Sequence, residues 1–495
     1  MQDTLEAGRG LCNEALSALL CEVSPLRIRE LGSWGVNWAR AEDGRFSQVK
    51  APGHSRKRCV YVDYLATGAA ICATLRNKVS RDDAIRRLSN VSITDIVVHD
   101  GEAVGAVGTD IPTAAPVIIK AGATVIASGG MSKMFQRTTA SNNLCGEGIG
   151  LALRAGARLT DIEFLQFYPN GHLAPRMVGL DPTTWEPTRV KLGGRLLNGK
   201  GEEFLQNYTE TRGGGAYDTA RDVLTYAIYK EVAEGRGTPH GGVYLSFQHV
   251  PGEAIERALG PVLEIFARNN IDLTKAPVEI FPIAHYQMGG IEVDTRMATR
   301  VPALYAAGEV VGGANGANRL SGNALPEALV FGERAGMSAA RHAKRRSVRD
   351  WDAAIAAPCI DTLRGIAGRN AANGAWPVHL LRELKALMWE KVGAFRSAAD
   401  LAAARGRIRA MRRAELDTLA VAEEAAHNTS LVEWCELRNG LYAAEAVALA
   451  AYHRRESRGA HQRVDFPAAD ESFRRSQHIV LAGDALVSDF AGAQP

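Results

Sequence analysis

The sequence predicts an α/β protein, α+β over the whole chain, that is divided into more than one domain. At 495 residues the chain is too long for a single hydrophobic core. Many of its 50 glycines fall in short clusters, as expected of a cofactor-binding α/β protein with many tight turns. Residues 283–342 show the pattern in one stretch, as strand, turn, strand, glycine-rich loop and helix.

The predicted elements follow in chain order. Residues 1–80 contain two helices around the short stretch YVDYLATG, and VSITDIVVHDGEAVGAVGTDI predicts a hairpin with HDGE as its turn. AGATVIASGG predicts a buried strand that ends at Gly129 and Gly130, and GEGIGLALRAGARL predicts a helix. Residues 173–282 are looser and more polar, the chain from about 346 is helical, and the end from SRGAHQRVDFP has little periodicity.

Composition excludes several classes of protein. A net charge of +3 gives no support for nucleic acid or an anionic membrane as the main partner. Seven scattered cysteines without a CxxC pair predict a reducing, cytoplasmic compartment and no iron–sulfur cluster or other metal site within this chain. No apolar run approaches the roughly 20 residues of a membrane span, so membrane association is expected only through a partner.

Two glycine motifs need an explanation. CGEGIG looks like a phosphate-binding loop, but its spacing is not G-x-G-x-x-G and it does not directly follow a strand, so packing at a helix N-terminus is the better interpretation. In AHYQMGGIEVD, Gly289 and Gly290 stand where a strand begins. Such a pair is expected where a flat object or another backbone comes very close.

The stretch from 283 to 336 carries the strongest signal. ALYAAGEV predicts a buried strand that stops at Gly308, which places Glu309 beyond its carboxyl end, where α/β folds bind ligands. A carboxylate there can accept hydrogen bonds from sugar or ribityl hydroxyls. GGANGANRLSGNAL supplies small residues that let backbone amides approach a ligand. Arg319, among these glycines, could bind a carboxylate with two hydrogen bonds.

These motifs resemble the succinate dehydrogenase/fumarate reductase flavoprotein family, which also contains L-aspartate oxidase. The resemblance runs in order through DTLEAG, TVIASGG, GEGIGLALRAGARLTDIEFLQFYPNG, GGRLLNGKGEEFLQNY, ARDVLTYAI, the 283–336 stretch and ESRGAHQRVDFP. It implies a two-part, Rossmann-like FAD-binding lobe (1–172 and 283–345), an inserted capping domain (173–282) and a C-terminal helical domain (346–495).

The resemblance also implies which residues bind FAD. Glu309 would bind the ribityl chain, and the flat object beside the Gly289–Gly290 pair would be the flavin ring. Glu147 stands where the family usually has aspartate in Gly-Asp-Gly. The implied cofactor-binding residues are Ile93 (through backbone near the adenine), Gly129, Gly130, Glu147, Gly289, Gly290, Gly308, Glu309, and, around the flavin, Asn323, Ala324 and Leu325.

For catalysis, His285 and Arg319 match the pair that binds the substrate carboxylate, and Arg221 matches the arginine assigned as proton donor. Taken alone, Arg221 would be a salt-bridge partner on a helix surface. A free arginine is a poor acid, so the role requires that a proton reach Arg221 as it gives one up. The implied reaction is hydride transfer between flavin and a C–C bond next to a carboxylate, an oxidoreduction of CH–CH groups.

The sequence departs from the family in two ways. The family's phosphate-binding βα unit precedes DTLEAG, where this chain begins; we expect a truncation at an internal methionine and weak or no FAD binding by the chain as it stands. Tyr168 and Asn170 replace the histidine and threonine of succinate and fumarate enzymes. TTWEPTRVKLGG shows no recognisable Glu/Arg proton-relay pair, since Arg189 is off register. A dicarboxylate should therefore bind less firmly.

Three functions remain open at this point. The first is a flavoprotein of the fumarate reductase or succinate dehydrogenase type, with a small carboxylate substrate and a separate iron–sulfur subunit. The second is an L-aspartate oxidase-like enzyme without such a partner. The third is a truncated, flavin-poor remnant without activity.

Overall fold

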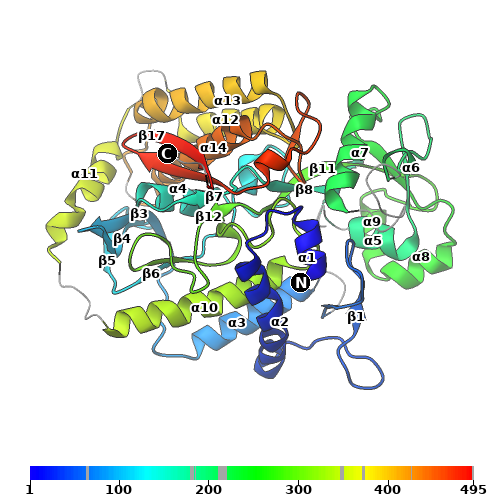
Figure 1. Cartoon of the computed structure of the whole chain (residues 1–495), viewed down its shortest axis with the longest axis horizontal. Helices are drawn as coiled ribbons and strands as arrows, with labels where there is room; N and C mark the ends of the chain where they lie inside the picture. Colours follow the sequence, from blue (N-terminus) through cyan, green and yellow to red (C-terminus); the bar gives the residue numbers. More distant parts are fainter. Residues whose placement is uncertain are drawn as a thin grey trace.

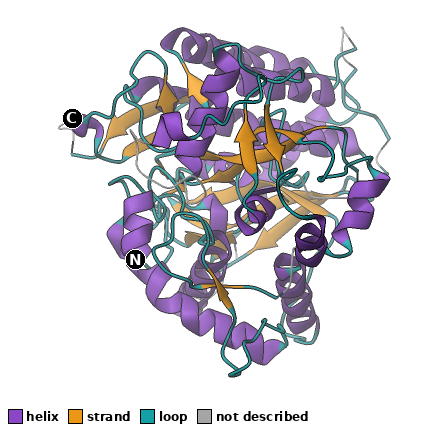
Figure 2. Cartoon of the chain, turned by 90° about the vertical axis from the view of Figure 1, so that its right-hand side faces the viewer, coloured by secondary structure: helices purple, strands orange, loops and turns teal. Residues whose placement is uncertain are grey.

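The computed structural model describes residues 1–62, 66–178, 183, 185–209, 220–345, 351–370, 374–424 and 426–492. The middle of the predicted YVDYLATG element and the start of the predicted C-terminal region, 346–350, lie outside these residues. Helices and strands alternate through most of the chain and confirm the predicted α/β class. Strands run through the middle of the molecule and helices surround them (Figure 2).

Two strands far apart in sequence form a parallel pair. β6 (Thr124–Ile126) and β13 (Leu304–Ala306) pair in register from Thr124 and Leu304 onward. The long helix α10 (Ala324–Arg345) packs against this pair and against α2 (Glu14–Trp34). Both predicted strands are confirmed, and β13 is buried as expected, whereas Val125 in the middle of β6 is exposed.

An antiparallel meander precedes β6. It consists of β3 (Val91–His99), β4 (Glu102–Asp110) and β5 (Pro116–Lys120). Asp100 and Gly101 join β3 to β4 with φ angles of 51° and 75°. Positive φ at both central residues is the requirement of a two-residue type I′ hairpin, so the predicted HDGE turn is confirmed.

A second sheet reaches from the centre into a lobe with its own core. Its four strands, in the order β8-β11-β10-β9, are β8 (Leu165–Ala174), β11 (Val278–Gln287), β10 (Val243–Ser246) and β9 (Arg195–Leu197). Helices α5 (Trp185–Leu192), α6 (Gln206–Thr209), α7 (Arg221–Ala233), α8 (Gly252–Leu259) and α9 (Val262–Arg268) cover it (Figure 1). Buried aromatic side chains fill this core: Trp185, Phe204, Phe247 and Phe266.

The C-terminal part is helical, as predicted, except at its end. Its helices are α11 (Ala357–Ile366), α12 (Pro377–Lys391), α13 (Ala398–Ala410) and α14 (Thr429–His453). α14 crosses α4 (Glu147–Arg154) so closely that a Cβ at Gly150 would overlap the backbone of Asn439. The interpretation of CGEGIG as helix packing is therefore confirmed at Gly150.

The last segment forms strands that the sequence did not reveal. β16 (Gln477–Ala482) and β17 (Ala485–Phe490) make a hairpin, and β16 pairs with β7 (Leu159–Thr160), which pairs with β12 (Gly290–Ile291). The remaining helices and strands are α1 (Gln2–Ala7), β1 (Gln48–Val49), β2 (Cys59–Val60), α3 (Thr67–Ser80), β14 (Phe395–Arg396) and β15 (Gln462–Arg463).

The Gly289–Gly290 pair lies against protein backbone. A Cβ at Gly289 would overlap the carbonyl group of Asp161, and a Cβ at Gly290 would overlap that of Val310. The neighbouring Ile291 also forms a parallel bridge to Val311. The expectation that a flavin ring makes this pair necessary is therefore wrong: three backbone segments meet here, and only residues without a side chain allow it.

Replacing Gly289 by alanine should destabilise the fold strongly. The added methyl group would meet backbone that cannot move away, so we expect a loss of about 3 kcal/mol or more in unfolding free energy. The control is Gly332→Ala, at an exposed position inside α10 with open space for a Cβ, which should gain about 0.5–1 kcal/mol. Denaturant unfolding of both variants measures this, and equal stability would contradict the close backbone contact at Gly289.

Candidate active site

Arg221, at the first position of α7, is a buried cation held by a carboxylate. Its Nε lies 3.1 and 3.2 Å from the two carboxylate oxygens of Glu186, and its Nη2 donates to Oε2 of the same group. Burial alone would lower the pKa of Arg221, but Glu186 raises it above its ordinary value. Arg221 is thus no surface salt-bridge partner, because it sits inside the protein beside the end of β8.

One amide oxygen joins Arg221 to Arg319. Gln166 Oε1 accepts from Arg221 Nη1 and from Arg319 Nη2, each at 3.1 Å. The amide nitrogen of Gln166 donates to Asn318 Oδ1 at 2.9 Å and to the carbonyl oxygen of Arg319 at 2.8 Å. A single side chain on β8 therefore contacts both guanidinium groups.

Arg319 keeps part of its hydrogen-bonding capacity unused. Its guanidinium carbon lies 4.1 Å from the centre of the Tyr286 ring, and its Nε has no hydrogen-bond partner among the described residues. Burial, together with the charge of Arg221, lowers the pKa of Arg319 to about 10, so it remains a cation at neutral pH. A buried N–H donor of a cation that lacks a hydrogen-bond partner can bind an anion.

His285 completes the cluster. Its Nδ1 lies 2.8 Å from Thr139 Oγ1, and its other ring nitrogen makes no hydrogen bond to a described residue. Burial lowers the pKa of His285 well below its ordinary value, and Arg221 and Arg319 lower it further. The ring is therefore neutral at pH 7 and acts as a hydrogen-bonding group, without adding charge to the site.

Tyr168 has its hydroxyl group engaged with the start of α5. The hydroxyl accepts from the Glu186 amide at 2.9 Å and donates to the carbonyl of Thr183. The Tyr168 ring lies 5.3 Å from that of His285, and the Arg221 guanidinium lies over it at 5.2 Å. Tyr168 thus belongs to the cluster, where it fastens the segment that carries Glu186 to β8.

Sequence reasoning missed three of these side chains, Gln166, Glu186 and Thr139. The segment TTWEPTRVKLGG, in which the sequence shows no recognisable Glu/Arg pair, contains Glu186, the direct partner of Arg221. Arg189, three positions later on the same helix, is also buried. A glutamate and an arginine spaced by three residues share one side of a helix, and that spacing was the available signal.

The carboxyl ends of β6 and β13 bring several predicted cofactor residues together. Glu309 Oε1 accepts from the Gln287 amide at 3.0 Å and lies against Gly130, where a Cβ would leave it no room. Gly308, with φ of 75°, makes the turn that places Glu309 there. Burial raises the pKa of the Glu309 carboxyl. Gly129 has a φ of 77° at the same turn after β6.

Glu147 and Ile93 lie further from the turn that carries Glu309. The Gly146 amide, just before Glu147, donates to the Gly130 carbonyl at 3.3 Å, so the start of α4 adjoins the turn after β6. Burial raises the pKa of Glu147 to about 7. Ile93 lies within β3 opposite Gly108, and no hydrogen bond between described residues links it to the Glu309 turn.

A cavity of about 450 Å³ lies between the N-terminal helices and the loop that follows Arg319. Asn323 and Leu325 line it together with Thr4 and His54, while Ala324 begins α10 beside it. Asn323 Nδ2 donates to Thr4 Oγ1 at 3.2 Å. This volume is in the range of small-molecule sites. The residues of the Glu309 turn do not line this cavity. The fit to FAD therefore rests on that turn, where Gly129 and Gly308 have positive φ and Glu309 follows the end of β13.

Beneath Arg319, Tyr286 and Glu327 form a buried polar pair. The Tyr286 hydroxyl donates to Glu327 Oε2 at 2.7 Å, and Asn315 Nδ2 donates to the same oxygen at 2.6 Å. Burial raises the pKa of Glu327 to about 7. The ring that supports Arg319 is therefore itself held by a carboxyl group.

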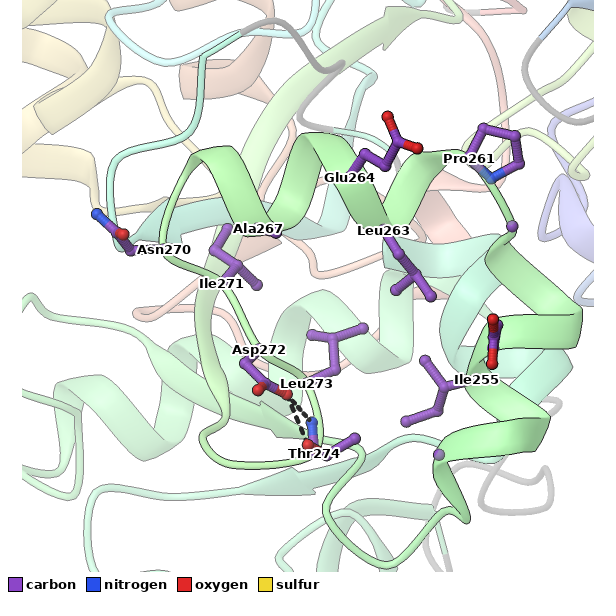
Figure 3. A pocket seen from close by; sticks show the side chains of 13 residues that line it. Ile255, Pro261, Leu263, Glu264, Ala267, Asn270, Ile271, Asp272, Leu273 and Thr274 are labelled. Carbon is purple, nitrogen blue, oxygen red and sulfur yellow. Dashed lines mark hydrogen bonds between the residues drawn. The ribbon is translucent and has the colours of Figure 1, made fainter.

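A larger hollow, of about 940 Å³, lies elsewhere, between α8 and α9 (Figure 3). It is lined by apolar side chains such as Ile255 and Leu263 and by carboxylates such as Glu264 and Asp272. No residue of the Arg221–Arg319 cluster lines this hollow. The Asp272 carboxylate already accepts hydrogen bonds from the amide and the hydroxyl of Thr274. The hollow is a surface depression of the lobe that contains α5 to α9.

Residues 1–325 match the family described as FAD binding domain, and residues 381–485 match the family described as fumarate reductase flavoprotein C-term. Among curated proteins, a subunit of fumarate reductase (CoM/CoB) from Methanothermobacter marburgensis is 38% identical over 99% of this chain and 87% of its own length.

The chain belongs to the fumarate reductase/succinate dehydrogenase flavoprotein family. FAD is its cofactor. An L-aspartate oxidase from Nicotiana tabacum is 32% identical over 96% of this flavoprotein and 73% of its own length. A mutant FrdA of E. coli quinol fumarate reductase superposes with a TM-score of 0.90, at 28% identity over 99% of this flavoprotein and 85% of that chain. The predicted family and fold are thus confirmed.

Two further findings concern the surroundings of the flavoprotein. Its relatives include a fumarate reductase subunit and chains of quinol fumarate reductase, so members of the family work together with partner subunits. Within the described residues, no helix has the length and apolar content of a membrane span, and no group of three or more His, Cys, Asp or Glu is placed to hold a metal ion.

Replacing Glu327 by glutamine should change how stability depends on pH. With its pKa raised from 4.5 to about 7, the folded protein keeps a proton that the unfolded chain has lost between these values. That contribution is fully present below about pH 4.5 and is lost as the pH rises through 7. Relative to the wild type, Glu327→Gln should therefore gain roughly 2–3 kcal/mol between pH 5 and pH 8.

Denaturant unfolding of the two proteins at both pH values measures this gain. A difference between wild type and variant that is the same at pH 5 and pH 8 would show that Glu327 is ionised normally.

Proposed function

We propose that the cluster of Arg221, His285 and Arg319 binds the carboxylate of a small substrate, and that the protein oxidises or reduces the C–C bond next to that carboxylate. The observation that carries the proposal is the convergence of two buried guanidinium groups on Gln166, with Arg319 Nε left without a partner among the described residues. Buried charges are normally paired, and here an anionic substrate is the missing partner.

Arg319 and His285 are the binding groups. The guanidinium of Arg319 offers a directed donor to a carboxylate oxygen, and its plane is fixed by Gln166 and by the Tyr286 ring. His285, neutral and oriented through Thr139, offers a second hydrogen bond. Together they hold one carboxylate in one orientation, which fixes the adjacent C–C bond.

Arg221 is the proton donor and Glu186 its relay partner. Arginine releases a proton only when another reaches it at once, and Glu186 Oε2 is hydrogen-bonded to Arg221 Nη2 inside the protein. A proton leaving Arg221 for the substrate carbon can therefore be replaced through Glu186. Gln166 keeps the opposite edge of Arg221 in place during this exchange.

FAD, when bound, supplies the hydride donor or acceptor for this chemistry. The residues that would hold it are Glu309 at the ribityl chain with Gly129, Gly130 and Gly308 around its turn, Glu147, Asn323, Ala324 and Leu325 near the flavin, and backbone near Ile93 at the adenine. Gly289 and Gly290 are left out of this set because backbone fills the space beside them.

The same proposal extends to domains and partners. We assign 1–172 and 283–345 to the FAD lobe, 173–282 to the cap and 346–495 to a helical domain; the separate aromatic core around Trp185 supports the cap. The subunit names of the relatives support a separate partner subunit, and we propose that this partner carries the iron–sulfur centres for electron transfer. A cytoplasmic location is in keeping with the seven free cysteines of the described residues.

Two lysine substitutions separate binding from proton transfer. Arg319→Lys keeps the charge but loses the fork of donors, so the dissociation constant for a carboxylate ligand should rise about tenfold or more. Arg221→Lys cannot contact both Glu186 and Gln166, so kcat should fall by about 100-fold or more with a smaller change in affinity.

Both effects are measured on FAD-loaded protein, by ligand titration of the flavin absorbance and by rates with a reduced viologen dye. Arg158→Lys, in a half-exposed pair with Glu292, is the matched control and should leave both quantities near the wild-type values. If all three variants behave alike, the cluster is not the carboxylate site.

A further inference from the structure

Residues 8–10 form a turn that follows α1 and contacts the loop of Arg319. The Ala317 amide, two residues before Arg319, donates to the Gly8 carbonyl at 3.0 Å. A Cβ at Gly316 would overlap the same carbonyl oxygen. The 8–10 turn and the loop that carries Arg319 therefore lie backbone against backbone.

The C-terminal part of the chain holds the 8–10 turn from another side. The Arg9 carbonyl accepts from Arg458 Nη1 at 2.9 Å, and Arg458 makes two further hydrogen bonds of 2.9 Å to Glu456. A Cβ at Gly10 would overlap the Arg474 guanidinium. Arg9 and Gly10 have φ angles of 54° and 81°. A non-glycine residue rarely adopts a positive φ and keeps it where the surrounding contacts hold it.

The Arg9 side chain reaches α7, one residue beyond Arg221. Its Nε and Nη2 both donate to Asp222 Oδ2, at 3.1 and 2.8 Å. The Asp222 side chain is 6% exposed and that of Arg9 is 37% exposed, and Asp222 Oδ1 has no hydrogen-bond partner among the described residues. An exposed ion pair contributes little, but a buried carboxylate is costly to leave without its cation. Loss of Arg9 should therefore disturb the start of α7.

The start of α7 carries the groups of the proposed proton transfer. Arg221 is its first residue and Asp222 its second. Gln166 of β8 joins Arg221 to Arg319. The Arg9–Asp222 pair adds a second connection, because the turn that carries Arg9 also contacts the loop of Arg319. The surroundings of the two active-site arginines are thus linked through residues that do not belong to the sheet of β8.

We propose that Arg9 is a positioning residue for Arg221: by pairing with Asp222 it fixes the start of α7 relative to the loop that carries Arg319. The inference rests on the proposed function, in which Arg221 delivers a proton to a substrate bound by Arg319. A proton donor must lie within hydrogen-bond reach of the atom that receives the proton, and small displacements lower the rate steeply. Arg9 acts on the rate through Arg221.

Hydrogen exchange of peptides from α7, in the FAD-loaded protein without substrate, tests the position directly. In Arg9→Gln, amides at the start of α7 should exchange about tenfold or more faster than in the wild type. One such amide is that of Leu224, which donates to the Ala220 carbonyl at 3.0 Å. Unchanged exchange in this variant overturns the inference.

Arg236→Gln is the matched control. It breaks an ion pair of similar burial, between Arg236 and Glu231, at the other end of α7 and within the same lobe. It should leave exchange at the start of α7 and kcat near the wild-type values. If it acts as strongly as Arg9→Gln, the effect is a general loosening of α7 and the inference is overturned.

Turnover tests the consequence for Arg221. With fumarate as the probe substrate and reduced viologen as the electron donor, Arg9→Gln should lower kcat about tenfold or more. The dissociation constant of fumarate, from flavin absorbance, should change by about twofold or less. Arg9→Lys keeps a cation for Asp222 and should stay within about threefold of the wild-type kcat. A lysine variant as slow as Arg9→Gln overturns the role of the ion pair.

Asp222→Asn tests whether the two residues act as a unit. If Arg9 acts through Asp222, the kcat of the double variant Arg9→Gln/Asp222→Asn should lie within about twofold of the slower single variant. Losses that multiply in the double variant mean that the two residues act independently, which overturns the inference.

The outcomes separate this inference from the proposed function. If Arg9→Gln keeps the wild-type kcat while Arg221→Lys loses it, the positioning role is overturned and the proposed function stands. If Arg221→Lys itself keeps the wild-type kcat, the proposed proton donor is refuted and the positioning role falls with it.

Discussion

Two guanidinium groups held inside the protein by one amide oxygen are the constraint on which the active site depends. Like charges at this separation repel, and three groups offset the repulsion: Glu186 beside Arg221, the Tyr286 ring beneath Arg319, and Gln166 between the two. The residual positive charge is thereby confined to one edge of Arg319. In the proposed function, this edge of Arg319 is the part of the cluster that receives the carboxylate.

This arrangement draws on parts of the chain that are far apart in sequence. Gln166 comes from β8, Arg221 from the first turn of α7, His285 from β11 and Arg319 from the glycine loop. The pairing of β8 with β11 sets the register between Gln166 and His285. An extra residue in β11 between Ala284 and Tyr286, and one in β8 between Tyr168 and Gly171, change the direction of the side chains there. The lobe that contains α5 and α7 contributes Glu186 and Arg221 to this arrangement.

The sequence allowed the fold and part of the site to be predicted, for physical reasons that differ between residues. Strands such as ALYAA and the HDGE turn carry local signals of hydrophobicity and turn chemistry, and they formed as expected. The role of Gly289 could not be predicted from the sequence, because a contact between segments far apart in the chain decides whether a flavin or a backbone fills the space beside it. Glu186 was missed because its partner, Arg221, lies 35 residues further along the chain. Neither composition nor hydrophobic periodicity reveals which charged side chains pair.

The sheet formed by β12, β7 and β16 has a consequence for how the molecule is made. β16 hydrogen-bonds to β7, which in turn pairs with β12, so that sheet joins residues near 160, 290 and 480. During synthesis the first two stretches leave the ribosome long before the third, and strand edges left open in this way invite unwanted association. Completion of this sheet, and with it the final setting of the glycine pair, must therefore follow translation of β16.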